Sequence, residues 1–247
     1  MTRILHPKYD AGYCFEVARS ENRKNMTLAL LKVFLAPFFI WVISILQKRF
    51  GAKAGGLFIG LPLTTGPFLI IVALQEGGTF AKLAAHGVMV GQISLIIFAY
   101  SYAQFALRLN WLAAIISASL AVLTSGYICQ LIPFNNWQVT LTLIVLWLLA
   151  LKFWPKYEKP LDKPAPPQWE LPLRLFLAAL FIIVLTWLAN ELGTKLSGAI
   201  STYPVILTVL GSLTHRRYGP KYIVDTLHGL AQIFMLTPLI MLAIVLI

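Results

Sequence analysis

The sequence predicts an all-α integral membrane protein of about eight transmembrane helices, built as two inverted-topology repeats with an interrupted second helix in each. Three observations lead to this fold class. The 247 residues are 59% hydrophobic and only 12% charged, which is more apolar material than a soluble core of this size can enclose. Two long apolar stretches carry Gly and Pro at their centres. The two halves of the chain also resemble each other at a constant spacing.

The charge of the chain fits a membrane protein better than a nucleic-acid partner. The net charge is +11, but Lys and Arg lie mainly in short connections between apolar runs, where such residues set membrane orientation. The two cysteines, Cys14 and Cys129, provide neither a disulfide framework nor metal-ligand spacing. We expect a multi-pass protein of the bacterial inner membrane, without a cofactor, that acts as a monomer or homodimer in the lipid bilayer.

The chain divides into a polar tail (1–25), repeat 1 (26–106), connecting transmembrane helices (107–154), a Pro-rich linker (155–170) and repeat 2 (171–247). The tail lacks the apolar core of a signal peptide and is interpreted as an extension from an earlier start codon, with an interaction arm as the alternative. Hydropathy predicts eight spans, at 26–47, 54–74, 80–106, 111–132, 137–154, 171–191, 196–214 and 221–247. Pro238 predicts a kink in the last span, and the linker is the predicted hinge between the halves.

The stretch 55–74 is long enough to cross a bilayer but cannot form an unbroken helix. Pro62 and Pro67 leave the carbonyls of Phe58 and Leu63 without their helical donors. In hydrocarbon such carbonyls need protein, water or a ligand instead. We therefore expect this break to face a cavity.

The same design returns in the stretch 196–214, where Pro204 frees the carbonyl of Ile200. Two interrupted helices in corresponding places are typical of secondary transporters. Hydroxyls at the breaks can bind an anion or a cation, although Ser and Thr in membrane helices also bond back to their own helix. The predicted substrate-binding residues are Pro62, Thr64, Thr65, Pro67, His86, Ser201, Thr202, Tyr203, Pro204 and His228.

A spacing of 142 residues relates the two repeats without gaps. It pairs Pro62 with Pro204, Gly77 with Gly219, and His86-Gly87 with His228-Gly229, and composition does not explain Gly, Pro and His matches in one register. Five spans separate the starts of the repeats, so the second copy enters the membrane from the opposite side. The acidic loop 75–79 corresponds to the basic loop 215–219, as the positive-inside rule favours after an inversion.

The basic loops near Lys48, in 152–163 and at Arg216 fall on one side of an eight-span protein, which we expect to be cytoplasmic, with both termini outside. The basic tail argues for the opposite orientation unless translation begins at Met26.

Ionisable residues within the predicted spans are candidates for function. His86 and His228 would bind substrate or protons, or alternatively tie their helices to freed carbonyls at the breaks; the Gly after each permits close approach by a neighbouring helix. Asp225 lies one turn before His228 and would hold its imidazole, which makes the two the proton-coupling candidates, with an interfacial ion pair as the alternative. Lys32 and Arg174 are expected to reach towards the membrane interface.

The run from Ala52 through Gly60, Pro62 and Pro67 to the Gly77 turn and His86-Gly87 resembles the core of the GlpM-like family of small bacterial inner-membrane proteins. The resemblance covers the first half and, more faintly, the second. It implies an inner-membrane location and a duplicated ancestral unit, and it transfers no activity. The second copy ends without counterparts of the two spans that follow the first.

No catalytic pattern of paired acids, metal ligands, phosphate-binding glycines or nucleophile elbow occurs, so an enzyme is not expected. We expect a secondary transporter that moves a small anionic or zwitterionic solute by alternating access, with proton coupling as an option. The alternative is a noncatalytic membrane assembly or lipid-handling protein, in which the breaks serve packing.

Overall fold

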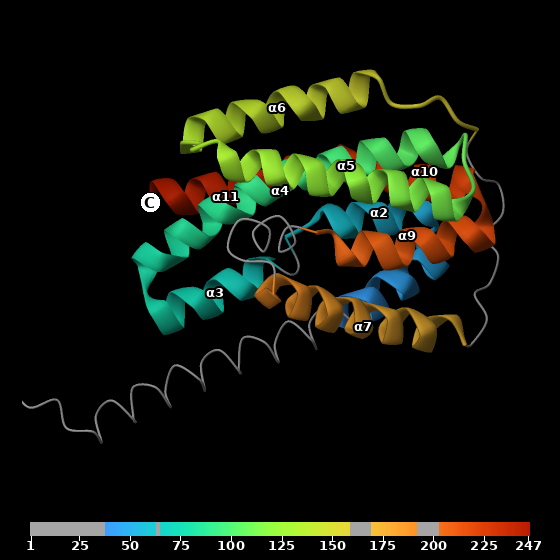
Figure 1. Cartoon of the computed structure of the whole chain (residues 1–247), viewed down its shortest axis with the longest axis horizontal. Coiled ribbons are helices and arrows are strands. Elements are labelled where there is room, and N and C mark those ends of the chain that lie inside the picture. The colour runs from blue at the N-terminus through green and yellow to red at the C-terminus, as the bar shows by residue number, and fades with distance from the viewer. Residues whose placement is uncertain (1–37, 63–64, 159–168, 192–202) are drawn as a thin grey trace, which may run out of the picture.

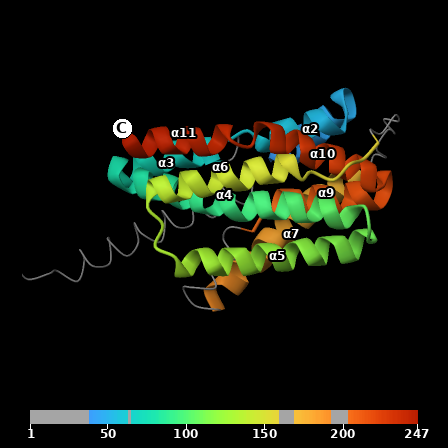
Figure 2. The ribbon, with the colours of Figure 1, turned by 90° about the horizontal axis from the view of Figure 1, so that it is seen from above.

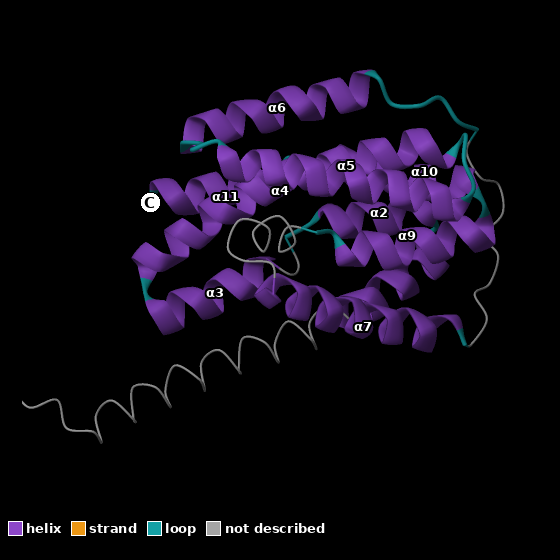
Figure 3. Ribbon diagram, in the orientation of Figure 1, coloured by secondary structure: helices purple, strands orange, loops and turns teal. Residues whose placement is uncertain are grey.

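A computed structural model describes residues 38–62, 65–158, 169–191 and 203–247. These residues form helices joined by short connections, and the described part contains no strand (Figure 3). The first helix covers residues 38–50. The others are α2 (Ala52–Gly60), α3 (Thr65–Glu76), α4 (Gly78–Ala106), α5 (Trp111–Leu131), α6 (Asn136–Lys152), α7 (Glu170–Glu191), α9 (Val205–Tyr218), α10 (Pro220–Ile233) and α11 (Leu236–Leu246).

The helices run back and forth along one long axis of the molecule (Figures 1 and 2). The long helix α4 lies at the centre and packs against α3, α5, α6, α10 and α11. Its inner face contributes Met89, Phe98 and Tyr102, all fully buried. The closest pair in the molecule is α2 with α10, which run parallel and side by side.

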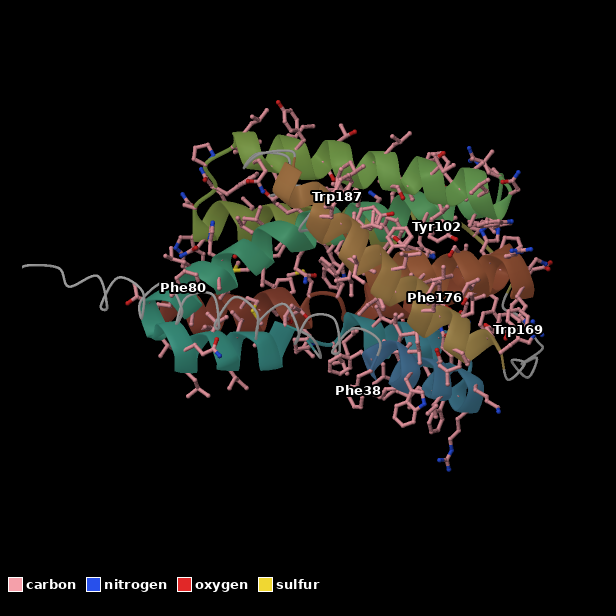
Figure 4. The ribbon with its side chains drawn as sticks, turned by 60° about the horizontal axis from the view of Figure 1, so that its bottom comes forward. Phe38, Phe80, Tyr102, Trp169, Phe176 and Trp187 are labelled. Carbon is pink, nitrogen blue, oxygen red and sulfur yellow. The ribbon has the colours of Figure 1, made fainter. Side chains whose placement is uncertain are left out.

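Three helices are long and apolar enough to cross a membrane: Gly78–Ala106, Trp111–Leu131 and the continuous segment Pro220–Leu246. Large apolar side chains also cover the outside of the molecule. Phe38, Phe176 and Trp187 point outwards and are more than half exposed, whereas Tyr102 lies between the helices (Figure 4). Because water-soluble proteins rarely expose such continuous apolar surface, these features indicate a membrane protein.

Helix starts follow local backbone rules. Asn135 caps α6 through a reciprocal capping box with Gln138, and Asn110 caps α5. Gly77 and Gly219 precede α4 and α10 with nearly identical backbone angles, φ 85° and ψ 169° against φ 85° and ψ 173°. This left-handed region favours glycine, which explains why the spacing of 142 residues preserves glycine at this turn.

The predicted break in the second span is confirmed, since α2 ends at Gly60 and α3 begins at Thr65. In the last span, α10 ends at Ile233 and α11 begins at Leu236, one turn before Pro238. Pro238 has no N–H for the carbonyl of Phe234, so the helix is interrupted there, as expected. The other predicted spans with described helices differ from them by a few residues at their ends.

Several predicted features lie outside the described residues. These are the tail 1–25, Lys32, Leu63, Thr64, most of the Pro-rich linker, and the first part of the second interrupted span with Ile200, Ser201 and Thr202.

Basic residues gather at one end of the bundle, on the right in Figure 1. There the helix 38–50 ends, α4 turns into α5, α6 and α9 end, and α2 and α10 begin. These segments carry Lys48, Arg49, Lys53, Arg108, Lys152, Lys156, Arg216, Arg217 and Lys221. The opposite end, with the α3–α4 turn and the C-terminus, carries Glu76 and Lys82. The predicted grouping of the basic loops on one side is therefore present.

Candidate functional site

The helix break after α2 lies against α10 and α11, and protein groups satisfy its carbonyls. Gly60 is buried, and its carbonyl accepts a hydrogen bond of 3.0 Å from the Thr237 hydroxyl. The expectation that the Phe58 carbonyl lacks a donor is wrong, because the Leu61 N–H reaches it at 3.3 Å. The chain tightens by one residue at its last turn, which replaces the donor that Pro62 removes.

Glycines allow α2 to approach α10 at backbone distance. A Cβ atom at Gly56 would lie 1.7 Å from the Thr226 carbonyl oxygen, and one at Gly229 would lie 2.2 Å from the Lys53 carbonyl oxygen. The close approach predicted beside His228 is therefore confirmed. The same prediction for Gly87 is wrong, since a Cβ there would meet nothing within 4 Å.

At the second break, Pro204 is buried and caps α9. The Tyr203 hydroxyl shares a hydrogen bond of 2.7 Å with Ser119 of α5, and its ring stacks on Phe181 of α7 at 6.2 Å. Tyr203 therefore joins α5, α7 and α9. At the first break, the Thr65 hydroxyl is buried and has no hydrogen-bond partner among the described residues.

The two repeat-related histidines occupy separate places. The His86 Nδ1–H donates to the side-chain oxygen of Asn136, at the start of α6, over 2.6 Å. His228 stacks on Trp154 at 5.4 Å and contacts Tyr157, both just after the end of α6. Because α6 has 17 residues, about 25 Å separates the two settings. The structure thus does not bring His86 and His228 together.

Asp225 and His228 are joined through a third residue. The Tyr157 hydroxyl donates to the Asp225 carboxylate over 2.7 Å and lies 3.1 Å from His228 Nδ1. A hydroxyl that donates to the carboxylate accepts from the imidazole, so the proton of His228 lies on Nδ1 in this chain of contacts. Burial, followed by the hydrogen bond and charge of Asp225, raises the pKa of Tyr157.

Arg174 is the centre of a buried polar cluster, which we call the Arg174 cluster. Its guanidinium donates to Glu170 at 2.5 Å, to Ser44 at 3.1 Å, to Thr214 at 3.3 Å and to Gln47 at 3.4 Å. Arg174 is only 4% exposed, so the expectation that it reaches to the membrane interface is wrong. An i,i+4 carboxylate on its own helix compensates its charge, which makes burial tolerable.

The Arg174 cluster connects the predicted halves of the molecule. Ser44 and Gln47 belong to the helix 38–50, Glu170 and Arg174 to α7, and Thr214 to α9. On its outer side, Glu170 also binds the Tyr218 hydroxyl at 2.9 Å and Arg217 at 3.4 Å. Three helices thus meet at one point near the basic end of the bundle.

Some donors of the Arg174 cluster remain unused within the described residues. Arg174 Nε and Gln47 Nε2 are buried and have no hydrogen-bond partner there. The cluster contains Arg174 and Arg217 against Glu170, so one positive charge is left over. Buried free N–H groups with excess positive charge suit an anionic oxygen.

Sequence reasoning missed Thr237, Tyr157 and the Glu170–Arg174 pair as members of polar sites. The pair had a readable signal, because the residues are four apart at the start of an apolar helix. Thr237 and Tyr157 carried none, since their partners are 177 and 68 residues distant in the chain. The described residues contain no group of three or more side chains that could hold a metal ion.

Comparison with known proteins adds no relative: no family model, no curated protein and no solved structure matches the chain.

Proposed function

We propose that the protein is a secondary transporter of the bacterial inner membrane that moves a small anionic or zwitterionic solute by alternating access. The observation that carries this proposal is the helix break between α2 and α3. The break is turned into the protein, with Gly60 buried and its carbonyl held by Thr237. Interrupted helices with inward-facing breaks form the substrate sites of many transporters.

The directions of the repeat-related helices support an inverted duplication. In Figure 1, α4 runs from left to right, whereas α10 and α11 run from right to left; α3 and α9 are opposed in the same way. The element ends also agree at the spacing of 142 residues. Glu76 and Tyr218 end α3 and α9, and Gly78 and Pro220 begin α4 and α10. This pattern also fits the proposed duplication of a GlpM-like unit.

The basic end of the bundle is proposed to face the cytoplasm, because Lys and Arg are retained on that side of bacterial membranes. The Arg174 cluster would then close the cytoplasmic side by tying the helix 38–50 to α7 and α9. Its unused donors favour an anionic group on the solute. The chain from Asp225 through Tyr157 to His228 would supply proton coupling.

The rival function is that of a noncatalytic membrane assembly or lipid-handling protein. One observation favours it: an almost wholly apolar groove lies between α4 and α6. In that case the breaks serve packing, and the protein binds lipid without moving a polar solute.

The deciding experiment uses the purified full-length protein with a panel of small carboxylates, phosphates and amino acids. A transported solute should raise the melting temperature in proportion to its occupancy of the native state and should enter proteoliposomes. Replacing Ser201 and Thr202 by Ala should reduce both effects. The control is Thr124→Ala, because Thr124 is exposed and bonds only to its own helix at Leu120. Stabilisation by lipid alone, with no solute effect across the panel, would support the rival.

A further inference from the structure

A groove of about 260 Å3 runs between α4 and α6 towards the basic end of the bundle. Ile97 and Tyr100 line it from α4, Leu146, Leu149 and Ala150 line it from α6, and Phe153 closes its end. Leu149 and Phe153 are 46% and 56% exposed, so the groove opens to the outside of the bundle.

The surroundings of the groove are those of a membrane. Its α4 wall belongs to a helix of 29 residues that is long and apolar enough to span a bilayer. Water in such a groove would have almost no polar partners, whereas a hydrocarbon chain would contact apolar side chains on both sides. The depth of the groove therefore suits an acyl chain.

The end of the groove is polar and positively charged. The Lys152 ammonium lies 5.6 Å from the centre of the Phe153 ring, which places a cation at the mouth. Gln104 holds this end in shape, since its amide donates to the Phe153 carbonyl at 3.1 Å and to the Tyr100 hydroxyl at 3.0 Å. Exposed Arg108 lies one turn beyond Gln104.

Acidic side chains do not neutralise this mouth among the described residues around it. The nearest in sequence, Glu158, binds Lys221 of α10 instead. Trp154, which contacts the Tyr100 ring at 6.4 Å, adds an aromatic residue at the depth where headgroups begin. Apolar walls, an aromatic boundary and a cationic mouth follow one another in the order of a phospholipid.

We propose that this groove binds one anionic phospholipid of the leaflet at the basic end, with an acyl chain between α4 and α6 and the phosphate beside Lys152 and Arg108. The site does not depend on the proposed transport function. It predicts specificity for headgroup charge, because each nearby Lys or Arg contributes about fivefold to the affinity for an anionic membrane lipid.

The test measures the melting temperature and the lipid retained in native mass spectra for the purified full-length protein. Phosphatidylglycerol should stabilise the protein and remain bound at one molecule per chain, and phosphatidylcholine of the same acyl composition should bind more weakly. Lys152→Gln with Arg108→Gln should remove most of this preference. Lys48→Gln with Arg49→Gln, which removes two charges at the same end on another helix, is the matched control.

Leu149→Trp tests the acyl part of the site, because the indole would fill the open side of the groove. It should weaken both lipids, while Leu120→Trp, at a residue 60% exposed on α5, should not. Glycerol phosphate or inorganic phosphate alone should have no effect. Equal binding of both lipids, loss of preference in the control alone, or conversion of a dimer to a monomer by Leu149→Trp with unchanged lipid retention would each overturn the proposal.

Discussion

Gly229 of α10 packs directly on the backbone of Lys53 in α2, so that an added Cβ would stand 2.2 Å from the Lys53 carbonyl oxygen. Its repeat-related residue, Gly87, has open space at the same position. The duplicated His-Gly pair thus has a packing role in one copy only.

Gly229→Ala should destabilise the protein by about 1–3 kcal/mol, because α2 and α10 must separate to admit the methyl group. Thermal unfolding in detergent measures the effect. Gly87→Ala is the matched control and should leave the melting temperature equal or slightly higher, since alanine favours helix. Equal effects of the two substitutions would contradict the close approach of α2 and α10.

Thr237→Val should cost about 1–3 kcal/mol, because it leaves the buried Gly60 carbonyl without its donor. Thr237→Ser keeps the hydroxyl and should restore most of the stability. If valine and serine behaved alike in the same unfolding measurement, the hydroxyl would not be what holds the break.

Arg174→Met should destabilise by about 3–5 kcal/mol, since it leaves the Glu170 carboxylate buried beside apolar groups. Adding Glu170→Gln to Arg174→Met should recover part of this loss, because the uncompensated charge is removed as well. The coupling is obtained from a double-mutant cycle of unfolding free energies. Arg216→Met, at an exposed position on α9, provides the comparison and should have a small effect. Additive effects of the Glu170 and Arg174 substitutions would argue against the buried pair.

Tyr157→Phe should change the response of the protein to alkali. Burial and then Asp225 raise the pKa of Tyr157 above its ordinary value near 10, so the folded state keeps a proton that the unfolded chain releases. This contribution to stability is fully present below about pH 10 and is lost as the pH rises through the folded-state pKa. Unfolding measured from pH 8 to pH 11 should therefore show a steeper loss for the wild type than for Tyr157→Phe. Parallel curves would mean that Tyr157 does not hold its proton through these contacts.

Single cysteines at Gly78 and Pro220 should be labelled from opposite faces of the membrane in a variant that lacks Cys14 and Cys129. These positions correspond at the spacing of 142 residues, are both exposed, and avoid the strained backbone of Gly77 and Gly219. The positive-inside rule places position 220 in the cytoplasm. Labelling of both cysteines from the same face would refute the inverted repeat and weaken the case for alternating access.

The sequence alone determined the features that depend on local backbone chemistry and on solvent. Apolar composition determined the helical membrane class, Pro62 and its neighbours determined the break before Thr65, and glycine determined the turn before α4 and α10. These outcomes follow from missing N–H groups, positive φ angles and the cost of exposing apolar surface, which act within a few residues.

Only the tertiary structure decided which polar groups meet. Thr237 holds the Gly60 carbonyl, Tyr157 joins Asp225 to His228, and Gln47 reaches Arg174 across 127 residues. Such partners depend on which helices pack side by side and on their rotation about their axes. Hydropathy is indifferent to both, because many arrangements of eight apolar helices bury similar area, whereas a hydrogen bond needs its two atoms within about 3 Å of each other.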